Sequence, residues 1–466
     1  MRILFVTSEI HPLVKTGGLA DVSASLPAAL QSLGMDIRIL VPGYPGVLSG
    51  IMDAAECASL PDGKLVCGKM PDTDVPVFAI DHRPLYWREG NPYLNEQGFD
   101  WPDNVSRFGL LSKTAALLAS KNSPLGWKPD IVHGNDWQCG LAPAFMHFSG
   151  SQAKSMMTVH NLAFQGNFSP DWVARLGLPS SAYAMHGVEF HGHFSFLKAG
   201  LYYSNTITTV SPTYAIEIQT PEMGCGMEGL LRSRSSDVYG ILNGIDLAEW
   251  NPEKDAYLAT NYDVRHLDAK IEVKRELQKS LGLEQKDDAP LLGVVSRLTY
   301  QKGLDLINVC ADALFEQGAQ LAILGSGDRE FEQAFLRLAE HYPGKCAASI
   351  GYDEALAHRI MAGADIFLMP SRFEPCGLNQ MYGMRYGTPP VVRKTGGLAD
   401  SVTDNETGFV FEKAEGRAFH EAISRALAAY EDKASFRRIQ RNGMEKHFDW
   451  ESSAKSYVDL YESLLA

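Results

Sequence analysis

Apolar runs of strand length alternate with segments of helical periodicity from one end of the chain to the other. Strands that alternate with helices build parallel sheets through βαβ units. In the first half of the chain, strands are expected at residues 3–6, 36–41, 75–80, 130–133, 155–159 and 206–210. Helices are expected between them, for example over residues 104–120 and 194–203. The alternation therefore predicts an α/β fold.

The same alternation starts again in the second half, after turn residues at 243–246 and a charged stretch at 252–288. Strands are expected there at residues 290–295, 320–324, 347–350, 365–369 and 390–393. A chain of 466 residues is also long enough for two domains. We therefore predict domains over residues 1–243 and 244–449, followed by an amphipathic helix within residues 450–466. The pattern alone assigns this helix to neither domain.

The composition argues against several classes of protein. A formal net charge of −14 does not suit a surface built to hold nucleic acid. No apolar run approaches the ~18 residues of a membrane span, and the run at residues 3–6 is too short for the core of a signal peptide. The seven cysteines form no C-x-x-C pair, so reduced thiols are expected. These features predict a cytoplasmic protein without a membrane or nucleic-acid partner.

One heptapeptide occurs twice in the chain. Residues 15–21 read K-T-G-G-L-A-D, and residues 394–400 repeat the same letters. We call these segments the first and the second glycine loop. Both follow an expected strand and precede an expected helix, where glycines let backbone amides approach a ligand. Because ligands bind at the carboxyl ends of strands in open α/β sheets, the loops predict two Rossmann-like halves with a cleft between them.

Cations follow two of the expected strands. Lys15 begins the first glycine loop, and Arg297 and Lys302 come after the strand at residues 290–295. Arginine binds a diphosphate through its bidentate fork, lysine acts as a point charge, and a helix that begins near Gly303 adds its positive end. Solvated surface cations beside ordinary turns are the alternative, and the spacing of Arg297 and Lys302 leaves it open.

Carboxylate and other polar groups follow further strands. Glu374, in the segment P-S-R-F-E-P-C-G-L at residues 370–378, suits either sugar hydroxyls or the cap of a helix. In the first half, H-G-N-D-W at residues 133–137 and T-V-H-N at residues 158–161 place Asp136 and His160 after neighbouring strands. A histidine at the end of a strand is more often structural than catalytic. Two such loops side by side nevertheless favour a site.

Two other signals are discounted. The sequence G-S-G-D-R-E at residues 325–330 begins like a dinucleotide fingerprint but has Glu330 in place of the third glycine. His186, His191 and His193 lie close together, but no neighbouring set of ligands at metal-binding spacing accompanies them. We therefore expect neither a nicotinamide cofactor nor a metal ion.

Taken together, the motifs resemble the bacterial glycogen synthase and plant starch synthase family. Besides the two glycine loops and T-V-H-N, the matching segments are F-L-K-A-G-L-Y-Y at 196, V-S-R-L-x-x-Q-K-G at 295 and S-R-F-E-P-C-G-L at 371. In this order they are highly specific, and they span nearly the whole chain. The resemblance implies GT-B architecture, in which two Rossmann-like domains with parallel sheets face each other across a deep cleft. It also implies that the C-terminal helix packs back on the first domain.

The resemblance further implies transfer of glucose from ADP-glucose to an α-1,4-glucan, with retention of configuration and without a metal or other cofactor. The partners would be ADP-glucose and glycogen or a maltooligosaccharide. The residues implied as catalytic are His160, Asp136, Arg297, Lys302 and Glu374. Those implied to bind the substrates are Lys15, Gly17, Gly18, Asp21, Asn161, Asn243, Gly351, Tyr352, Cys376, Gly377 and Leu378.

Two positions depart from the expected pattern. Many retaining GT-B enzymes have a second glutamate at the position of Tyr382, and Asn379 stands where close relatives are expected to have threonine. A single carboxylate is typical of the glycogen synthase family. The alternatives are another retaining GT-B glucosyltransferase, a glucan phosphorylase, which needs pyridoxal phosphate, and an inactive glucan-binding protein.

Overall fold

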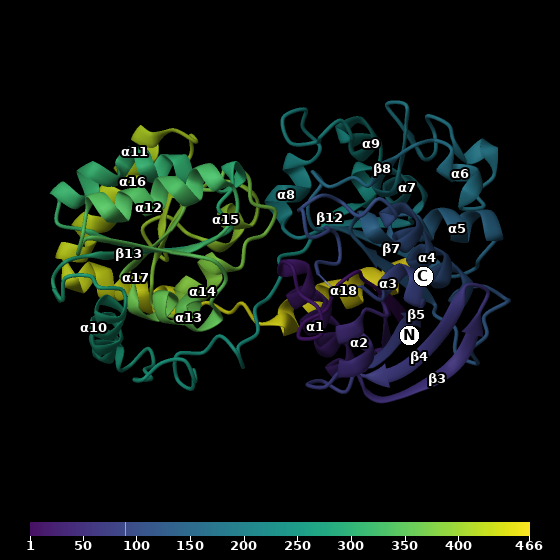
Figure 1. Cartoon of the computed structure of the whole chain (residues 1–466), viewed down its shortest axis with the longest axis horizontal. Helices are drawn as coiled ribbons and strands as arrows, with labels where there is room; N and C mark the ends of the chain where they lie inside the picture. The colour runs from purple at the N-terminus through teal and green to yellow at the C-terminus, as the bar shows by residue number, and fades with distance from the viewer. Residues whose placement is uncertain (89) are drawn as a thin grey trace. The chain divides into compact units, whose positions relative to one another are not determined.

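The structure is a computed structural model that describes residues 1–88 and 90–466 (Figure 1). It divides into two units, of which the first comprises Met1–Gly244 together with Trp450–Ala466, and the second comprises Ile245–Asp449. The boundary expected after residue 243 lies next to this division. The last helix therefore belongs to the first unit, although it ends the chain.

The first unit is built on a large sheet with the strand order β12-β11-β7-β6-β1-β2-β5-β4-β3, in which the strands from β12 to β5 are parallel. The strands are β1 (Arg2–Val6), β2 (Asp36–Pro42), β3 (Met52–Leu60), β4 (Gly63–Lys69), β5 (Pro76–Asp81), β6 (Ile131–Asn135), β7 (Lys154–Val159), β11 (Thr206–Thr209) and β12 (Val238–Gly240). The strands expected in this half correspond to β1, β2, β5, β6, β7 and β11, and all are confirmed.

One edge of this sheet carries a hairpin that the sequence does not predict. β3 pairs with β4, and β4 pairs with β5, in antiparallel register. β3 is exposed along most of its length and therefore lacks the apolar run of a buried strand. A disulfide joins Cys57 on β3 to Cys67 on β4. The expectation of reduced thiols is therefore wrong for these two cysteines.

Helices connect the strands, as βαβ units require. Those described in the first unit are α1 (Gly18–Ser32), α2 (Pro45–Gly50), α3 (Arg83–Tyr86), α4 (Asn104–Leu118), α5 (Ala142–Ser149), α6 (Trp172–Arg175), α7 (Phe196–Tyr203), α8 (Pro212–Glu217), α9 (Glu228–Ser233) and α18 (Trp450–Leu465). The helices expected over residues 104–120 and 194–203 are confirmed as α4 and α7. Smaller elements are the sheet of β8 (Asn167–Phe168), β10 (His193–Ser195) and β9 (Glu189–Phe190) and the 3-10 turns η1 (Trp137–Cys139), η2 (Ser180–Ala182) and η3 (Ser235–Asp237).

The central strand β1 shows why the sheet could be recognised in the sequence. The side chains of Ile3, Leu4, Phe5 and Val6 are all fully buried in the core of the first unit. Successive residues of a strand point to opposite faces, so complete burial means that both faces of the sheet are covered. Such strands consist of continuous apolar runs, and polar residues begin where the strands end.

The C-terminal helix α18 packs on the first unit, against α1. Its buried residues recur at helical spacing: Trp450, Ala454, Tyr457 and Tyr461. The hydroxyl of Tyr461 lies 2.6 Å from Nδ1 of His133 in β6, and Nε2 of His133 lies 2.6 Å from the hydroxyl of Thr158. Burial lowers the pKa of His133 to about 3, so the ring is neutral. His133 therefore links the last helix to the sheet.

The substitution Tyr461→Phe is expected to lower the free energy of unfolding by about 1–3 kcal/mol, because it leaves a buried ring nitrogen of His133 without its hydrogen bond. Urea unfolding of the full chain, followed by tryptophan fluorescence, measures the change. Tyr239→Phe is the control, because the Tyr239 side chain is 41% exposed and its substitution should change stability by less than about 0.5 kcal/mol. Equal unfolding curves for the two variants would contradict the role given to His133.

The second unit contains a parallel sheet in the order β15-β14-β13-β16-β17-β18. The strands are β13 (Leu291–Val295), β14 (Gln320–Gly325), β15 (Cys346–Ile350), β16 (Ile366–Met369), β17 (Pro390–Arg393) and β18 (Phe409–Phe411). The strands expected in this half correspond to β13 to β17, and they are confirmed. The sequence does not predict β18, which is a short strand at the edge of the sheet.

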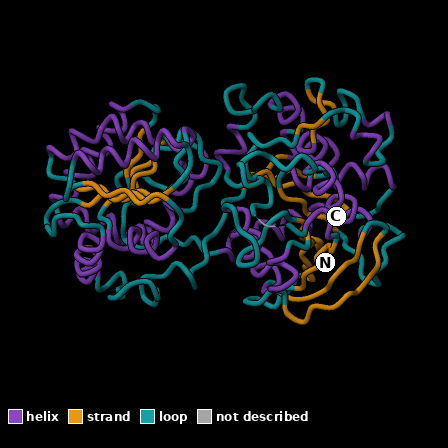
Figure 2. The backbone as a smooth tube through the Cα atoms, in the orientation of Figure 1, coloured by secondary structure: helices purple, strands orange, loops and turns teal. Residues whose placement is uncertain are grey.

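Figure 2 shows the strands of the second unit (orange) between helices (purple) on both sides. These helices are α10 (Lys270–Ser280), α11 (Leu304–Glu316), α12 (Arg329–His341), α13 (Glu354–Gly363), α14 (Asn379–Arg385), α15 (Gly396–Ser401), α16 (Gly416–Glu431) and α17 (Lys433–Met444), with 3-10 turns η4 (Leu267–Ala269) and η5 (Tyr300–Lys302). Within the described residues of the whole chain, none of the helices has both the length and the apolar character that a membrane span requires.

Candidate active site

The polar residues singled out in the first unit follow three neighbouring parallel strands, β1, β6 and β7. The first glycine loop comes after β1, Asp136 directly follows β6, and His160 and Asn161 directly follow β7. The carboxyl ends of parallel strands lie at one edge of their sheet, which is where ligands bind in open α/β folds. The fold therefore gathers these predicted residues at one edge of the first unit.

Within the first glycine loop, Nζ of Lys15 forms an ion pair with the Asp21 carboxylate at 2.8 Å. The two side chains are 30% and 22% exposed, so the pair is open to a ligand. A Cβ at Gly17 would meet no atom within 4 Å, so packing does not require glycine at this position. α1 begins at Gly18 and adds the positive end of a helix to the loop. Together these features provide a cationic loop with accessible backbone amides.

Glu9 holds this loop in place, and sequence reasoning missed it. Its Oε2 accepts hydrogen bonds from the backbone N–H of Thr16 at 2.6 Å and from the Thr16 hydroxyl at 2.8 Å. The hydroxyl of Tyr93 donates to its other carboxylate oxygen at 3.0 Å. Burial raises the pKa of Glu9, and the hydrogen bonds from Thr16 oppose this rise. A carboxylate three residues after the buried strand β1 was the signal that could have revealed it.

Asp136 connects the ends of β6 and β7. Its Oδ1 accepts hydrogen bonds from the backbone N–H groups of His160 at 2.7 Å and of Asn161 at 3.3 Å. Nε2 of His160 lies 3.0 Å from Oδ1 of Asn135. The backbone of Asp136 has a φ of +55°, which is uncommon for a residue with a side chain and is a form of strain often found at functional sites. The structure therefore brings Asp136, His160 and Asn161 together.

Burial acts in opposite directions on the two titratable groups of this cluster. It raises the pKa of Asp136 to about 7, because the charged carboxylate is disfavoured there, and the two backbone N–H groups only partly compensate. It lowers the pKa of His160 to about 3, because the charged imidazolium is disfavoured. At neutral pH the imidazole is therefore uncharged, and Asp136 exchanges its proton readily. A group that titrates near the working pH is suited to catalysis.

In the second unit, the site is formed after the neighbouring strands β13 and β16. Lys302 ends the turn η5 after β13, and Glu374 follows β16. Nζ of Lys302 lies 2.6 Å from Oε2 of Glu374, which also accepts a hydrogen bond from the Ser371 hydroxyl at 2.9 Å. The Lys302 and Glu374 side chains are only 15% and 8% exposed. Arg297 takes no part in this pair and is exposed.

The turn at residues 374–378 is held by the second glycine loop. The N–H of Gly397 donates to the carbonyl of Glu374 at 3.1 Å. A Cβ at Gly396 would lie 2.0 Å from that same carbonyl oxygen, and one at Gly397 would lie 2.1 Å from the carbonyl oxygen of Cys376. Gly396 has the place in the heptapeptide that Gly17 has in the first copy, where there is open space. The second copy therefore needs its glycines for packing.

The other residues of this turn have distinct surroundings. Gly377 has a φ of +72°, which favours glycine. Cys376 is buried and Leu378 is half-buried. Asn379, which begins α14, donates a hydrogen bond from its side-chain amide to the carbonyl of Val295 at 2.7 Å. This bond explains the asparagine, because it ties α14 to the end of β13.

Tyr382 takes the place of a second carboxylate and is part of a stack of rings. It stacks on Trp250 with 3.8 Å between ring centroids, and Trp250 stacks on His358 at 3.8 Å. Tyr382 and Trp250 are each 7% exposed. A buried, stacked ring leaves Glu374 as the single carboxylate of the motif.

Three further predicted residues lie elsewhere at strand ends. Gly351, with a φ of +134°, follows β15, and the next residue, Tyr352, is 78% exposed with its hydroxyl bonded to the Glu354 carboxylate. Asn243 follows β12 in the first unit and is buried. Among the described residues, Oδ1 of Asn243 has no hydrogen-bond partner, so it is available to a ligand hydroxyl.

The structure also explains the two discounted signals. A Cβ at Gly325 would lie 1.9 Å from the carbonyl oxygen of Ser296, and one at Gly327 would lie 2.5 Å from that of Leu298. These glycines are therefore needed where β14 passes the loop after β13, which accounts for them without a dinucleotide. In the described part of the chain, His186, His191 and His193 do not belong to a group of converging metal ligands.

Family models match most of the chain in two segments. The model of the starch synthase catalytic domain matches residues 2–233, and the model of glycosyl transferases group 1 matches residues 274–443. The chain is 53% identical to a glycogen synthase of Nitrosomonas eutropha, over all of this chain and 96% of that one. It is also 53% identical to a glycogen synthase of Nitrosospira multiformis, over all of this chain and 97% of that one.

Solved structures agree with this relationship. The catalytic domain of starch synthase IV from Arabidopsis thaliana, bound to ADP and acarbose, is 33% identical and superposes with a TM-score of 0.88, with 99% of each chain covered. A sucrose-phosphate synthase from Thermosynechococcus elongatus, with 18% identity and a TM-score of 0.62 over 100% of this chain and 99% of that one, shares the fold. The chain therefore belongs to the glycogen synthase and starch synthase family of glycosyltransferases, and its two Rossmann-like units have the GT-B fold.

Proposed function

We propose that the chain transfers glucose from ADP-glucose to the non-reducing end of an α-1,4-glucan with retention of the α configuration. The observation that carries this proposal is the largely buried Lys302–Glu374 pair after β13 and β16, whose side chains are 15% and 8% exposed. The pair supplies a cation for a leaving diphosphate beside a carboxylate for sugar hydroxyls. The relatives named glycogen synthase and the ADP in the matching starch synthase structure support this choice of reaction and donor.

The cations of the proposed site stabilise the leaving group. When the bond between the anomeric carbon and the phosphate oxygen breaks, negative charge grows on ADP. A lysine about 4 Å from a phosphate contributes up to ~4 kcal/mol at an effective dielectric constant near 20. We assign this role to Lys302 and Arg297, with Lys15 as a third cation. Glu374 and Asp21 neutralise Lys302 and Lys15 before the donor binds.

Preorganised cations also make a metal ion unnecessary in this proposal. In many enzymes that cleave phosphate bonds, a divalent ion carries the developing charge. Fixed side chains perform the same task when they are already oriented toward the position where the charge develops. Lys302 is held by its ion pair, and Glu374 by Lys302 and Ser371, so the reacting groups need little rearrangement.

Asp136 and His160 are assigned to the acceptor and to the reacting carbon. Positive charge develops on the sugar as its bond to ADP breaks. A neutral His160 can lie beside this charge without repelling it, since burial lowers its pKa to about 3. Asp136, once ionised, stabilises the same charge and can accept a hydrogen bond from an acceptor hydroxyl. Asn161 and Asn243 are assigned to contacts with sugar hydroxyls, and Gly351 and Tyr352 to the adenosine.

Retention of configuration requires either a covalent intermediate or attack from the face that the leaving group departs from. We propose same-face attack, in which the acceptor oxygen bonds to the anomeric carbon as the bond to ADP breaks. The departing phosphate then takes the proton of the acceptor hydroxyl. Glu374 is not assigned as a nucleophile, because Lys302 and Ser371 already engage its carboxylate. A glycosyl adduct on the chain, detected by mass spectrometry during turnover, would contradict this route.

One assay tests the donor and the independence from metal. Radiolabelled ADP-glucose and UDP-glucose are each incubated with glycogen and the full chain, with and without EDTA. Transfer to glycogen is expected to be faster with ADP-glucose and unchanged by EDTA. Incubation without glycogen measures hydrolysis of the donor. A lack of transfer from either donor would refute the proposed reaction. Loss of transfer in EDTA, with recovery in magnesium, would refute the metal-free mechanism alone.

We also propose that the enzyme works in the cytoplasm with no partner beyond its substrates. The proposed donor is a doubly charged nucleotide sugar, and charged groups cross a lipid bilayer only at high cost. The net charge of −14 disfavours binding to nucleic acid.

A further inference from the structure

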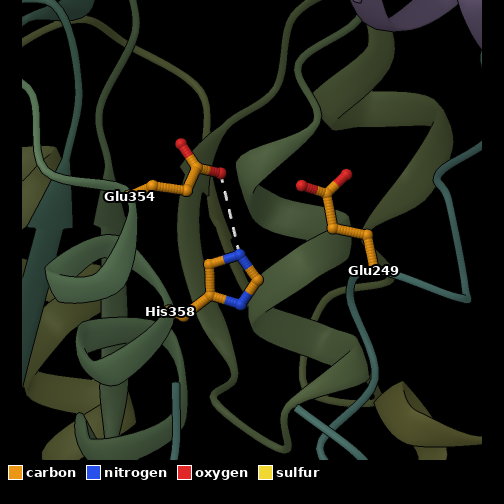
Figure 3. A group of neighbouring side chains, drawn as sticks. All are labelled: Glu249, Glu354 and His358. Atoms are coloured by element: carbon orange, nitrogen blue, oxygen red, sulfur yellow. Dashed lines mark ion pairs between the residues drawn. The ribbon is translucent and has the colours of Figure 1, made fainter. Parts of the chain in front are cut away.

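A cluster of three residues that could bind a metal ion lies in the second unit, and none of the three is assigned to the proposed reaction. Glu354 and His358 lie four residues apart on α13, and Glu249 comes from the segment that begins the unit (Figure 3). One ligand atom of each residue lies within 4.8 Å of those of the other two. Residues four apart on a helix point to the same side, so α13 directs two ligands toward Glu249.

The orientation of His358 is fixed from outside the cluster. Its Nδ1 lies 2.7 Å from Oδ2 of Asp255, and its ring stacks on Trp250. Asp255 is held in turn by the hydroxyl of Tyr386. Histidines that bind metals commonly donate one ring N–H to a carboxylate, which orients the other nitrogen toward the ion. Asp255 therefore directs Nε2 of His358 toward Glu354 and Glu249.

The other ring nitrogen of His358, Nε2, provides independent evidence that this cluster binds a ligand. The His358 side chain is 1% exposed, and among the described residues its Nε2 has no hydrogen-bond partner. The closest carboxylate oxygen, from Glu354, is 3.7 Å away, which is too far for a hydrogen bond. Leaving a buried polar atom without a hydrogen bond costs free energy. Such atoms are therefore usually bound to an ordered water molecule, an ion or another ligand.

A proton competes for this nitrogen. The carboxylates of Asp255 and Glu354 lie 2.7 Å and 3.7 Å from the two ring nitrogens of His358, and their negative charge favours the protonated ring. The same negative charges attract a metal cation. A metal that binds the neutral ring must therefore displace a proton, as it does in other proteins.

We propose that Glu249, Glu354 and His358 bind a divalent transition-metal ion of the zinc class. One imidazole nitrogen and two carboxylates suit zinc, cobalt or manganese better than calcium, which prefers oxygen ligands throughout. Ligand atoms around a tetrahedral zinc ion lie about 3.5 Å apart, and those of the cluster lie within 4.8 Å of one another, so binding requires them to close by at most about 1.3 Å. Glu249 and Glu354 are partly exposed, which gives an ion a route to the buried nitrogen.

The proposed ion is structural rather than catalytic. It would cross-link the segment at residues 249–255 to α13 within the second unit. None of its ligands is assigned to the transfer of glucose. Chelation is therefore expected to lower the melting temperature of the chain while leaving transfer to glycogen unchanged. The proposed metal site rests on different residues from the proposed reaction, so a test of one can fail while the other is confirmed.

Binding of Zn²⁺ to the full chain, stripped with EDTA and then dialysed, tests the site. Isothermal titration calorimetry is expected to give one Zn²⁺ per chain, and Co²⁺ is expected to develop the visible absorption of a nitrogen-ligated ion. Glu249→Gln is expected to weaken the binding at least about tenfold. His358→Gln is expected to weaken it further and to remove the Co²⁺ absorption. The Glu249 variant keeps the His358–Asp255 bond, so it remains decisive if the His358 variant fails to fold.

The matched control is His193→Asn, in the exposed H-x-H sequence of the first unit. It is expected to bind Zn²⁺ like the wild type. Loss of binding in this control would assign the ion to that sequence and overturn the proposal. Absence of binding at millimolar Zn²⁺, or wild-type affinity in either folded cluster variant, would overturn it as well.

Discussion

Lys302→Ala is expected to lower the turnover number about 10²- to 10³-fold at saturating ADP-glucose, which is the scale observed when one donor to a developing oxyanion is removed. The Lys302 side chain is 15% exposed, and its Nζ lies 2.6 Å from Oε2 of Glu374. Water that replaces it therefore cannot stabilise the charge of the leaving diphosphate equally well. The loss should appear in kcat more than in KM, because the charge on the leaving diphosphate is largest in the transition state. Initial rates of transfer to glycogen measure both parameters.

Lys394→Ala provides the matched control for this experiment. Lys394 begins the second glycine loop, as Lys15 begins the first, but its side chain is 60% exposed and lies 3.5 Å from Glu412. Its removal is expected to leave kcat within about twofold of the wild type. Wild-type turnover in Lys302→Ala would remove this lysine from the mechanism. Equal losses in both variants would show a general effect of charge rather than a specific one.

Asp136→Asn is expected to lower kcat about 10²- to 10⁴-fold and to raise the melting temperature near pH 7. Burial raises the pKa of Asp136 to about 7 in the folded chain, from 3.8 in the absence of burial. Between these values the folded state binds more protons than the unfolded state, so stability falls as pH rises from about 4 to about 7. Asparagine carries no proton to lose and removes this penalty. The positive φ and the buried carboxylate of Asp136 therefore lower stability, and we expect them to serve activity.

Thermal melts and transfer rates at several pH values between about 5 and 8 test this expectation. The stability gained by Asp136→Asn should grow as pH rises through the window, and wild-type kcat should fall as pH drops below about 7. Asp130→Asn is the control, because Asp130 precedes β6, at its other end, and binds the N–H of Arg2. It should retain wild-type kcat. A fully active Asp136→Asn variant would contradict the assignment.

The sequence predicted most of the parallel strands because many of them are buried on both faces and therefore contain short apolar runs, as β1, β13 and β14 do. It did not predict β3, since an exposed strand at the edge of a sheet lacks that pattern. It did not predict β18 either, because three residues are too few to establish a pattern. The Cys57–Cys67 pairing depends on the register of that unpredicted hairpin, so the expectation of reduced thiols failed at the same place.

The candidate site was predicted in outline for a related reason. Polar residues at strand ends are visible in a sequence, and so Lys302, Glu374, Asp136 and His160 could be named. Their partners could not, because contact between Lys302 and Glu374 depends on β13 lying beside β16 in the sheet. The same limit hid Glu9, whose contact with Tyr93 joins residues far apart in the chain. The two identical heptapeptides also concealed the fact that only the second is closely packed at Gly396, its first glycine.

The place of α18 has a consequence for biosynthesis. Ribosomes make the first unit's sheet before the second unit, yet α18, which belongs to the first unit, is made only after the second unit. Until α18 is made, the surface of the first unit that it covers is exposed to solvent, and Nδ1 of His133 lacks its contact with the Tyr461 hydroxyl. Domains generally fold as units during synthesis, so the inserted second unit can finish before the unit that began first. A nascent chain that stalls before residue 450 therefore contains all residues of the second unit and a first unit without α18, and the apolar surface that α18 would cover is exposed to proteases.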